Sequence, residues 1–190
     1  MKMETLQELY LDMLKDTYDA EQQLTKSLPK MAKACENEEL RAAFEEHLEV
    51  TNGQIQRLDQ IFEMLGEKSK GKKCMAMKGL LEEAKELMEE DADPNVLDAG
   101  LIAAAQKVEH YEIAAYGCLR TYAELMGLDE QAELLQETLD EEKEADDNLT
   151  DLAETCINLE AEEGGEMDEE SEESDEEKPK NRVKGQGSKV

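Results

Sequence analysis

The chain has 190 residues, with 21 lysines and arginines against 50 aspartates and glutamates, so its formal charge at pH 7 is −29. This length suits one domain, or one domain with a tail. Such an acidic chain repels phosphate backbones and anionic membrane faces, and no basic patch reverses the sign, so we expect it to bind neither nucleic acid nor membranes. The longest uncharged stretch, Ala99 to Gln106, is far shorter than the roughly 20 apolar residues of a membrane helix.

The N-terminus and the cysteines indicate where the protein resides. The first eight residues (MKMETLQE) carry acidic side chains where a signal peptide has an apolar segment. The four cysteines are widely spread and none forms a C-x-x-C pair, so reduced thiols are expected. A cytoplasmic location is therefore predicted.

Composition and periodicity predict an all-α fold. Leu, Glu, Ala, Lys, Gln and Met dominate, and β-branched residues are few. Steps of three and four residues mark a first long helix, whose apolar stripe is Leu6, Leu9, Met13, Thr17, Ala20, Leu24, Leu28 and Met31. Pro29 lies in its last turn, where it is expected to kink the helix or to start a new one.

Three further long helices and one short helix are predicted. Asn37 can cap the second long helix, which Gly66 should end in a left-handed conformation. A lysine-rich connector leads to a short amphipathic helix that ends before Pro94. The third long helix runs from about Val96 to Gly127, and the fourth follows at once and fades after Ile157.

Two helix pairs with short loops, joined by a long crossover that holds the short helix, fit a four-helix bundle. We expect this bundle to span residues 1–158. From residue 159 the apolar periodicity stops, and an acidic run is followed by a basic end. Because such a segment cannot bury enough apolar surface to offset its ordering entropy, residues 159–190 are predicted to be a disordered tail.

Ionisable side chains interrupt the middle of each long stripe, at what should be one depth of the bundle: Asp16, Glu21, His47, Glu109, Glu112, Glu142 and Asp146. Burying several unpaired carboxylates costs many kcal/mol unless protons or cations compensate them. A pair of iron or manganese ions is a suitable compensation for such oxygen-rich ligands. The predicted metal ligands are Glu21, His47, Glu109, Glu112, Glu142 and Asp146.

A metal-free alternative stays open. In a chain this rich in glutamate, carboxylates fall beside a helical stripe by chance, and they could pair with Lys15, Gln23, Lys107 or Lys143. The protein would then be a dimeric interaction module whose acidic tail binds a basic partner. A homodimer is expected in either case, because apolar side chains of the short helix could exceed what one bundle covers: Met77, Leu80, Leu81 and Leu87.

At these residues the chain resembles the ferritin-like stress proteins typified by bacterial YciF. The resemblance runs from about residue 3 to 159 and is carried by residues 14–24 (LKDTYDAEQQL), 47–51 (HLEVT), 103–114 (AAAQKVEHYEIA) and 138–143 (TLDEEK). It implies a ferritin-like bundle, a homodimer, a dinuclear metal centre and a link to stress responses. Whether the protein is an enzyme stays undecided at this level.

Two departures from the expected pattern concern the ligands. Di-iron bundles carry Glu-x-x-His on two helices, but Phe44 stands three residues before His47 and Lys107 three before His110. Val50 also stands where the family has a second glutamate after Glu49.

Overall fold

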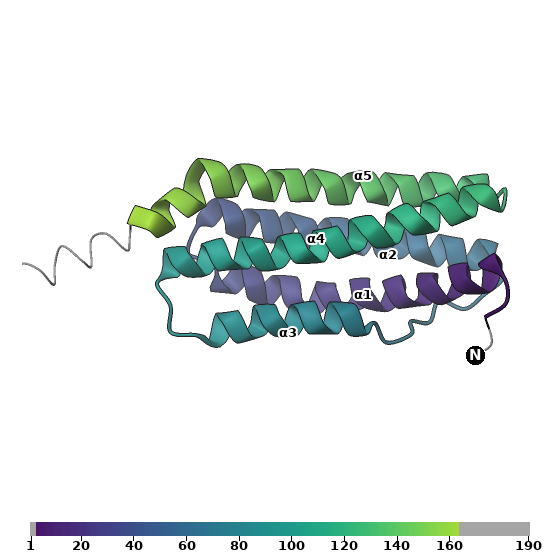
Figure 1. Ribbon diagram of the computed structural model, residues 1–190, viewed down its shortest axis with the longest axis horizontal. Coiled ribbons are helices and arrows are strands. Elements are labelled where there is room, and N and C mark those ends of the chain that lie inside the picture. The colour runs from purple at the N-terminus through teal and green to yellow at the C-terminus, as the bar shows by residue number, and fades with distance from the viewer. Residues whose placement is uncertain (1–2, 164–190) are drawn as a thin grey trace, which may run out of the picture.

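A computed structural model describes residues 3–163, and all regular structure in that range is helical. The elements are α1 (Leu6–Ala34), α2 (Glu38–Met64), α3 (Met75–Glu89), α4 (Pro94–Leu125), α5 (Asp129–Leu152) and a π-helical turn η1 (Ala153–Ile157). The four long helices lie side by side as a bundle, and α3 runs along its flank beside α1 and α4 (Figure 1). The predicted all-α bundle with an extra helix in its crossover is confirmed.

The ends of the helices follow local chemistry. The Asn37 side chain accepts hydrogen bonds from two backbone N–H groups in the first turn of α2, as predicted. Gly66 and Gly127 end α2 and α4 with φ of 67° and 69°, the left-handed region that glycine enters without steric cost. Asp93 caps α4, whose first residue is Pro94.

Pro29 does not divide α1. The helix continues through it to Ala34 as one element, so no new helix starts there. The neighbouring side chains of Leu28 and Met31 are both buried in the same core, which holds the chain on the helical path despite the missing backbone donor.

The C-terminal helix extends beyond the predicted end of the bundle. After α5, the π-helical turn and a further helical segment carry the chain to residue 163, five residues past the expected boundary at 158. Ile157 is buried in the core, and this packing ties the turn to the bundle. The rest of the predicted tail, residues 164–190, lies outside the described residues.

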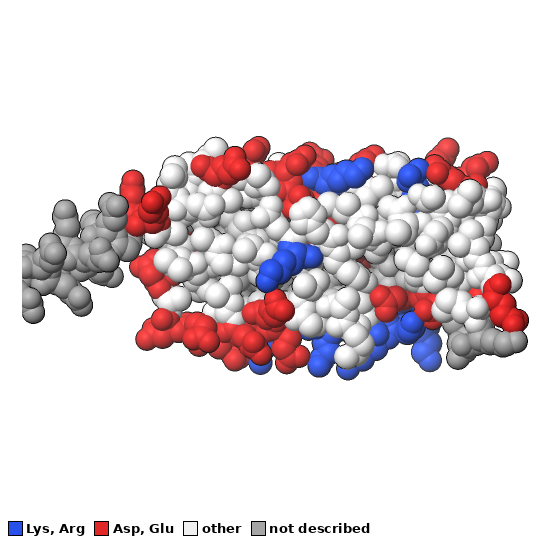
Figure 2. Space-filling model, in the orientation of Figure 1, with Lys and Arg blue, Asp and Glu red and all other residues white. Residues whose placement is uncertain are grey.

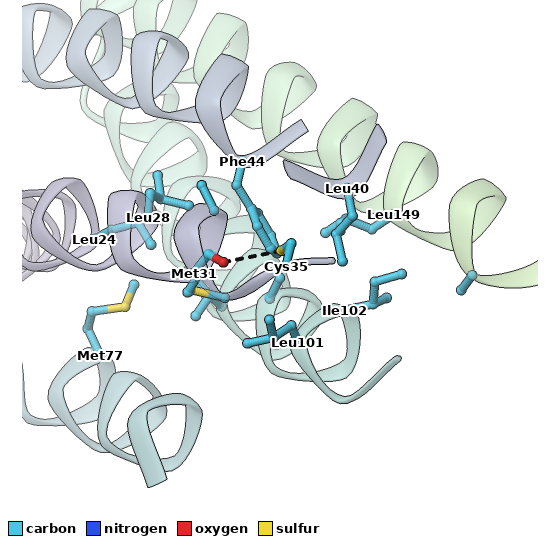
Figure 3. Close-up of a cluster of buried hydrophobic side chains, with 14 of the residues drawn as sticks. Leu24, Leu28, Met31, Cys35, Leu40, Phe44, Met77, Leu101, Ile102 and Leu149 are labelled. Carbon is cyan, nitrogen blue, oxygen red and sulfur yellow. Dashed lines mark hydrogen bonds between the residues drawn. The ribbon is translucent and has the colours of Figure 1, made fainter. Parts of the chain in front are cut away.

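Two apolar clusters fill the two ends of the bundle. One surrounds Leu28, Met31 and Phe44 (Figure 3), and the other surrounds Tyr10 and Phe62. Between them, each long helix contributes buried polar side chains, which are Thr17 and Glu21, Thr51 and Gln54, Glu109 and Glu112, and Thr138 and Glu142. The bundle therefore has a polar layer at mid-height between two apolar halves.

Four apolar side chains of α3 pack on their own bundle, whereas Met75 at its first turn is 65% exposed. Met77 is fully buried, and Leu80, Leu81 and Leu87 are half-buried against the core. Leu87 packs so closely on Gly100 that a Cβ there would lie 2.8 Å from it. These four side chains are therefore largely covered by their own bundle, and the homodimer stays a prediction.

Charge is unevenly spread over the surface. Acidic side chains gather along the two long edges of the face drawn in Figure 2, over α5 and α3, and the middle of that face carries few charges. Within residues 3–163, no helix is both long and apolar enough to cross a membrane.

Candidate metal centre

Four side chains from three helices converge in the polar layer. His47 of α2, Glu109 and Glu112 of α4, and Glu142 of α5 each offer one ligand atom, and these four atoms all lie within 4.8 Å of one another. We call this group the carboxylate cluster. The His47 side chain is 10% exposed, and the side chain of Glu142 is not exposed at all.

The polar atoms of the cluster lack partners. Both carboxylate oxygens of Glu112 and of Glu142 are buried without a hydrogen bond from any described residue, as are Oε2 of Glu109 and Nε2 of His47. The His47 Nε2 atom lies 3.5 Å from Glu109 Oε1 and 3.9 Å from Glu142 Oε2. Since buried polar groups are nearly always satisfied, this set of unpartnered atoms calls for a compensating proton or cation.

Burial shifts the protonation of every member. Loss of hydration raises the pKa of Glu112 and of Glu142 well above the ordinary value, and raises the pKa of Glu109 to about 7. The same loss lowers the pKa of His47 to about 4, so its imidazole is neutral at pH 7. Without a cation the carboxyls hold protons, and a bound cation would displace them while using the neutral imidazole as a ligand.

Glu21 of α1 adjoins the cluster. Its side chain is fully buried, one oxygen accepts a hydrogen bond from the Tyr116 hydroxyl, and Oε2 has no partner among the described residues. Burial and the charge of Glu142 raise its pKa well above the ordinary value. Glu21 lies outside the 4.8 Å group, but its carboxylate brings a fourth helix to the polar layer.

Asp146 and Asp16 do not join the cluster. Asp146 accepts a hydrogen bond from Gln106 Nε2 at 3.2 Å and lies 3.6 Å from His110 Nε2, with 17% of its side chain exposed. Asp16 accepts a hydrogen bond from the Tyr111 hydroxyl at 2.9 Å. Of the six predicted ligands, the structure therefore brings four together in the carboxylate cluster, places Glu21 beside it, and places Asp146 nearer the surface.

Two residues beside the cluster were not predicted as site residues. The fully buried Tyr116 donates a hydrogen bond to Glu21. The buried Gln54 side chain donates to Glu141 at 3.2 Å, and its Oε1 atom has no partner among the described residues. A signal for Gln54 was available, because a polar residue on the buried stripe of a helix must find a polar neighbour.

The pairings of the metal-free alternative are not formed. Lys15 lies 3.8 Å from Glu67, Lys107 3.0 Å from Glu83 and Lys143 3.3 Å from Asp140, while Gln23 donates to Asp19 at 2.6 Å. All four partners lie outside the carboxylate cluster. The predicted lysine and glutamine compensation is therefore wrong, because these side chains point away from the polar layer.

The departures from the di-iron pattern have structural counterparts. Phe44 is buried in an apolar cluster and the exposed Lys107 pairs with Glu83, so neither replaces a ligand. Val50 lines a cavity that adjoins His47 and Glu109. On α4, Glu109 and Glu112 instead supply two carboxylates from one helix face.

Comparisons with known proteins agree with this architecture. Residues 5–162 match the family described as a domain of unknown function, DUF892. The curated protein YciF of Escherichia coli K12 is 53% identical over 163 residues, covering 85% of this chain and 98% of its own length.

Solved structures give the same result. The crystal structure of the E. coli stress protein YciF superposes with a TM-score of 0.79 at 54% identity, over 82% of this chain and 99% of that chain. YcfI of Rhodopseudomonas palustris superposes with a TM-score of 0.77 at 48% identity, over 78% of this chain and 95% of that chain. A Xanthomonas campestris protein superposes with a TM-score of 0.68 at 25% identity, over 84% of this chain and 99% of that chain. Because the family model matches residues 5–162, this chain belongs to the DUF892 family, and it is similar to the stress protein YciF over most of its length.

Proposed function

We propose that the protein binds two divalent metal ions, iron or manganese, in its polar layer and acts in a stress response. The observation that carries the proposal is the set of buried carboxylate oxygens without partners. Glu21, Glu109, Glu112 and Glu142 bring four negative charges when ionised, which two divalent cations would balance. Carboxylates with one imidazole are a ligand set that suits iron and manganese.

The chain's own residues would prepare this site. His47 is held neutral by burial, so its Nε2 lone pair is free to bind. The Tyr116 hydroxyl holds one oxygen of Glu21 and leaves the other directed to the layer. Reduced iron or manganese bound there would supply one-electron chemistry with oxygen or peroxide. The two apolar halves of the bundle would keep water from reaching the site along the bundle axis.

Metal content tests this function. The protein, purified without chelator, is analysed by mass spectrometry for bound metal, and its apo form is melted with and without ferrous iron under anaerobic conditions. The proposal expects about two ions per chain and a higher melting temperature with iron. The exposed variant Glu133→Gln is the control and should behave like the wild type. A wild type that neither retains metal nor shifts with iron would refute the proposal.

The proposal includes a homodimer, which the resemblance to YciF-like proteins supports, and a cytoplasmic location, which agrees with the four free cysteines. Light scattering tests the first, with an expected mass near twice 21.4 kDa. A monomer mass across micromolar concentrations would contradict it. Fractionation of cells producing the tagged chain tests the second.

A further inference from the structure

A cavity of about 200 Å³ opens between α2 and α5, and we call it the α2–α5 pocket. Glu46 and Glu144 line it and are exposed, and Val50 and Ala145 line it and are half-buried. The exposure of the lining side chains thus decreases from the surface inward along α2 and α5.

The inner end of the α2–α5 pocket is the carboxylate cluster. His47 and Glu109 line the pocket with side chains only 10% and 4% exposed. Both carry a buried polar atom, Nε2 and Oε2, without a partner among the described residues. An ion that moves inward along the pocket therefore meets two atoms of the proposed metal site that can coordinate it, His47 Nε2 and Glu109 Oε2.

The charge of the pocket favours a cation over a neutral molecule. The ionisable side chains that line it are four glutamates and His47, and no lysine or arginine is among them. Neither Glu46 nor Glu144 pairs with a lysine or arginine in the described part of the chain, whereas the third surface-side glutamate, Glu141, is bound by Arg57. Free carboxylates at the mouth concentrate cations and give no advantage to a neutral molecule such as peroxide.

The size of the pocket agrees with this choice. A site needs about 10–15 Å³ of cavity volume to hold one water molecule. With about 200 Å³, the pocket holds several waters, as a hydrated ion requires. A second hollow, between α1 and α2, is lined by two basic and two acidic side chains, Lys33 and Arg41 with Glu45 and Glu49. No residue of the carboxylate cluster lines it, so it offers no path to the cluster.

We propose that the α2–α5 pocket is the route by which a hydrated divalent cation reaches the carboxylate cluster, with Glu46 and Glu144 attracting it at the mouth. This inference rests on the proposed function, and it adds residues that guide the ion without binding it at the end of its path. If the inference holds, the rate of metal loading depends on Glu46 and Glu144, which are not metal ligands.

Loading kinetics with cobalt(II) as the probe test the role of charge. The full-length apoprotein is mixed with cobalt(II) in a stopped-flow instrument, and the visible bands of the bound ion are followed. The double variant Glu46→Gln with Glu144→Gln should load about tenfold more slowly at low salt, and this difference should shrink as salt is added. The control pair Glu63→Gln with Glu133→Gln, exposed on the same two helices, removes the same charge elsewhere and should load at the wild-type rate.

A second variant tests the path itself. Val50→Phe places an aromatic ring in the pocket wall. If this variant has a lowered melting temperature, Ala145→Phe places the ring there from α5 instead. An obstacle in the path raises the barrier in both directions, so association and dissociation should slow by the same factor, while the dissociation constant and the cobalt spectrum stay unchanged. Ala103→Phe, on the exposed face of α4, is the control and should leave both rates unchanged.

The outcomes separate the route from the function. If the wild type shows the cobalt bands but the mouth variant or the wall variants load at the wild-type rate, the route is refuted and the metal site stands. If the wild type shows no cobalt bands, both proposals are refuted. Slower loading confined to the mouth and wall variants supports the route.

Discussion

Glu112→Gln should stabilise the apoprotein and weaken the metal-loaded protein. Glu112 is fully buried, and neither of its oxygens accepts a hydrogen bond from an N–H or hydroxyl group of the described residues, although the Glu21 carboxyl is close enough to share a proton with it. Burial raises its pKa well above the ordinary value of 4.5, and the charge of Glu21 raises it further, so the folded apoprotein carries the protonated acid at pH 7. Glutamine has the same shape and needs no proton.

The magnitude follows from the cost of that proton. Holding a carboxyl of ordinary pKa 4.5 in its protonated form at pH 7 costs about 1.36 × 2.5, or roughly 3 kcal/mol. The glutamine amide has its own cost of about 1–3 kcal/mol if its hydrogen bonds are incompletely satisfied, and less if its N–H groups donate to Glu21. This cost offsets part of the stability that is gained by removing the proton. We expect a net gain of about 1–2 kcal/mol, which is about 2–8 °C in melting temperature for a chain of this size. The gain should disappear near pH 4.5, where the proton costs almost nothing.

Bound metal reverses the order of stability of the wild type and the variant. With free ferrous iron at a hundred times its dissociation constant, the wild type should gain roughly 2.7 kcal/mol. If the lost ligand weakens binding a hundredfold, the variant gains only about 0.4 kcal/mol at the same concentration. The assay is anaerobic thermal melting of both proteins at pH 7 and pH 4.5, with and without iron, using Glu133→Gln as the exposed control. A variant that is less stable than the wild type at pH 7 without metal, or a gain that persists at pH 4.5, would refute the burial argument.

Three further predictions concern the apoprotein. Its free energy of unfolding should fall between pH 5 and pH 8, because burial raises the pKa of four carboxyls, Glu21, Glu109, Glu112 and Glu142, that of Glu109 to about 7. The stability that the protonated carboxyls give is complete below pH 4.5 and is lost as the pH rises through their raised pKa values. The lowered pKa of His47, about 4, acts in the opposite direction between pH 4 and pH 6.5, but as one group against four, and urea titrations measure the net change. Tyr116→Phe should cost about 1–3 kcal/mol in the same titrations, because the buried Glu21 loses its hydroxyl donor. Asp98→Ala should cost a similar amount, about 1–3 kcal/mol, because this buried carboxylate accepts two backbone N–H groups of the α1–α2 turn, at 3.1 and 2.7 Å.

Controls make these predictions decisive. Tyr122→Phe removes a hydroxyl from a half-buried tyrosine of the same helix, and Asp147→Ala removes an exposed carboxylate of α5. Each should change stability by less than about 0.5 kcal/mol. A rise in apoprotein stability from pH 5 to pH 8 would contradict the first prediction, and a loss in either test variant no larger than in its control would contradict the other two.

Local chemistry explains why the helices were predictable. The period of the apolar side chains sets which residues form each helix, and the cap at Asn37 and the left-handed glycines at Gly66 and Gly127 are decided by a few neighbouring residues. Pro29 marks the limit of such reasoning. Its local preference to break a helix was overruled by the burial of residues on both sides of it.

The site needed the tertiary structure. Sequence periodicity could place Glu112, Glu142 and Asp146 at a similar depth, but it could not decide which of them faces the centre, since a rotation of a few tens of degrees about a helix axis separates a buried ligand from a flanking carboxylate. Packing of α4 on α5 buried the first two and left Asp146 bound to Gln106.

The sequence by itself therefore determined the helices, their order and the polar layer at mid-height, because these depend on periodicity and on neighbours along the chain. Only the tertiary structure decided that Tyr116 holds Glu21, that the nearby lysines point away, and that a pocket connects the surface to His47. These contacts join residues from different helices, and their geometry is set by how the helices pack against one another.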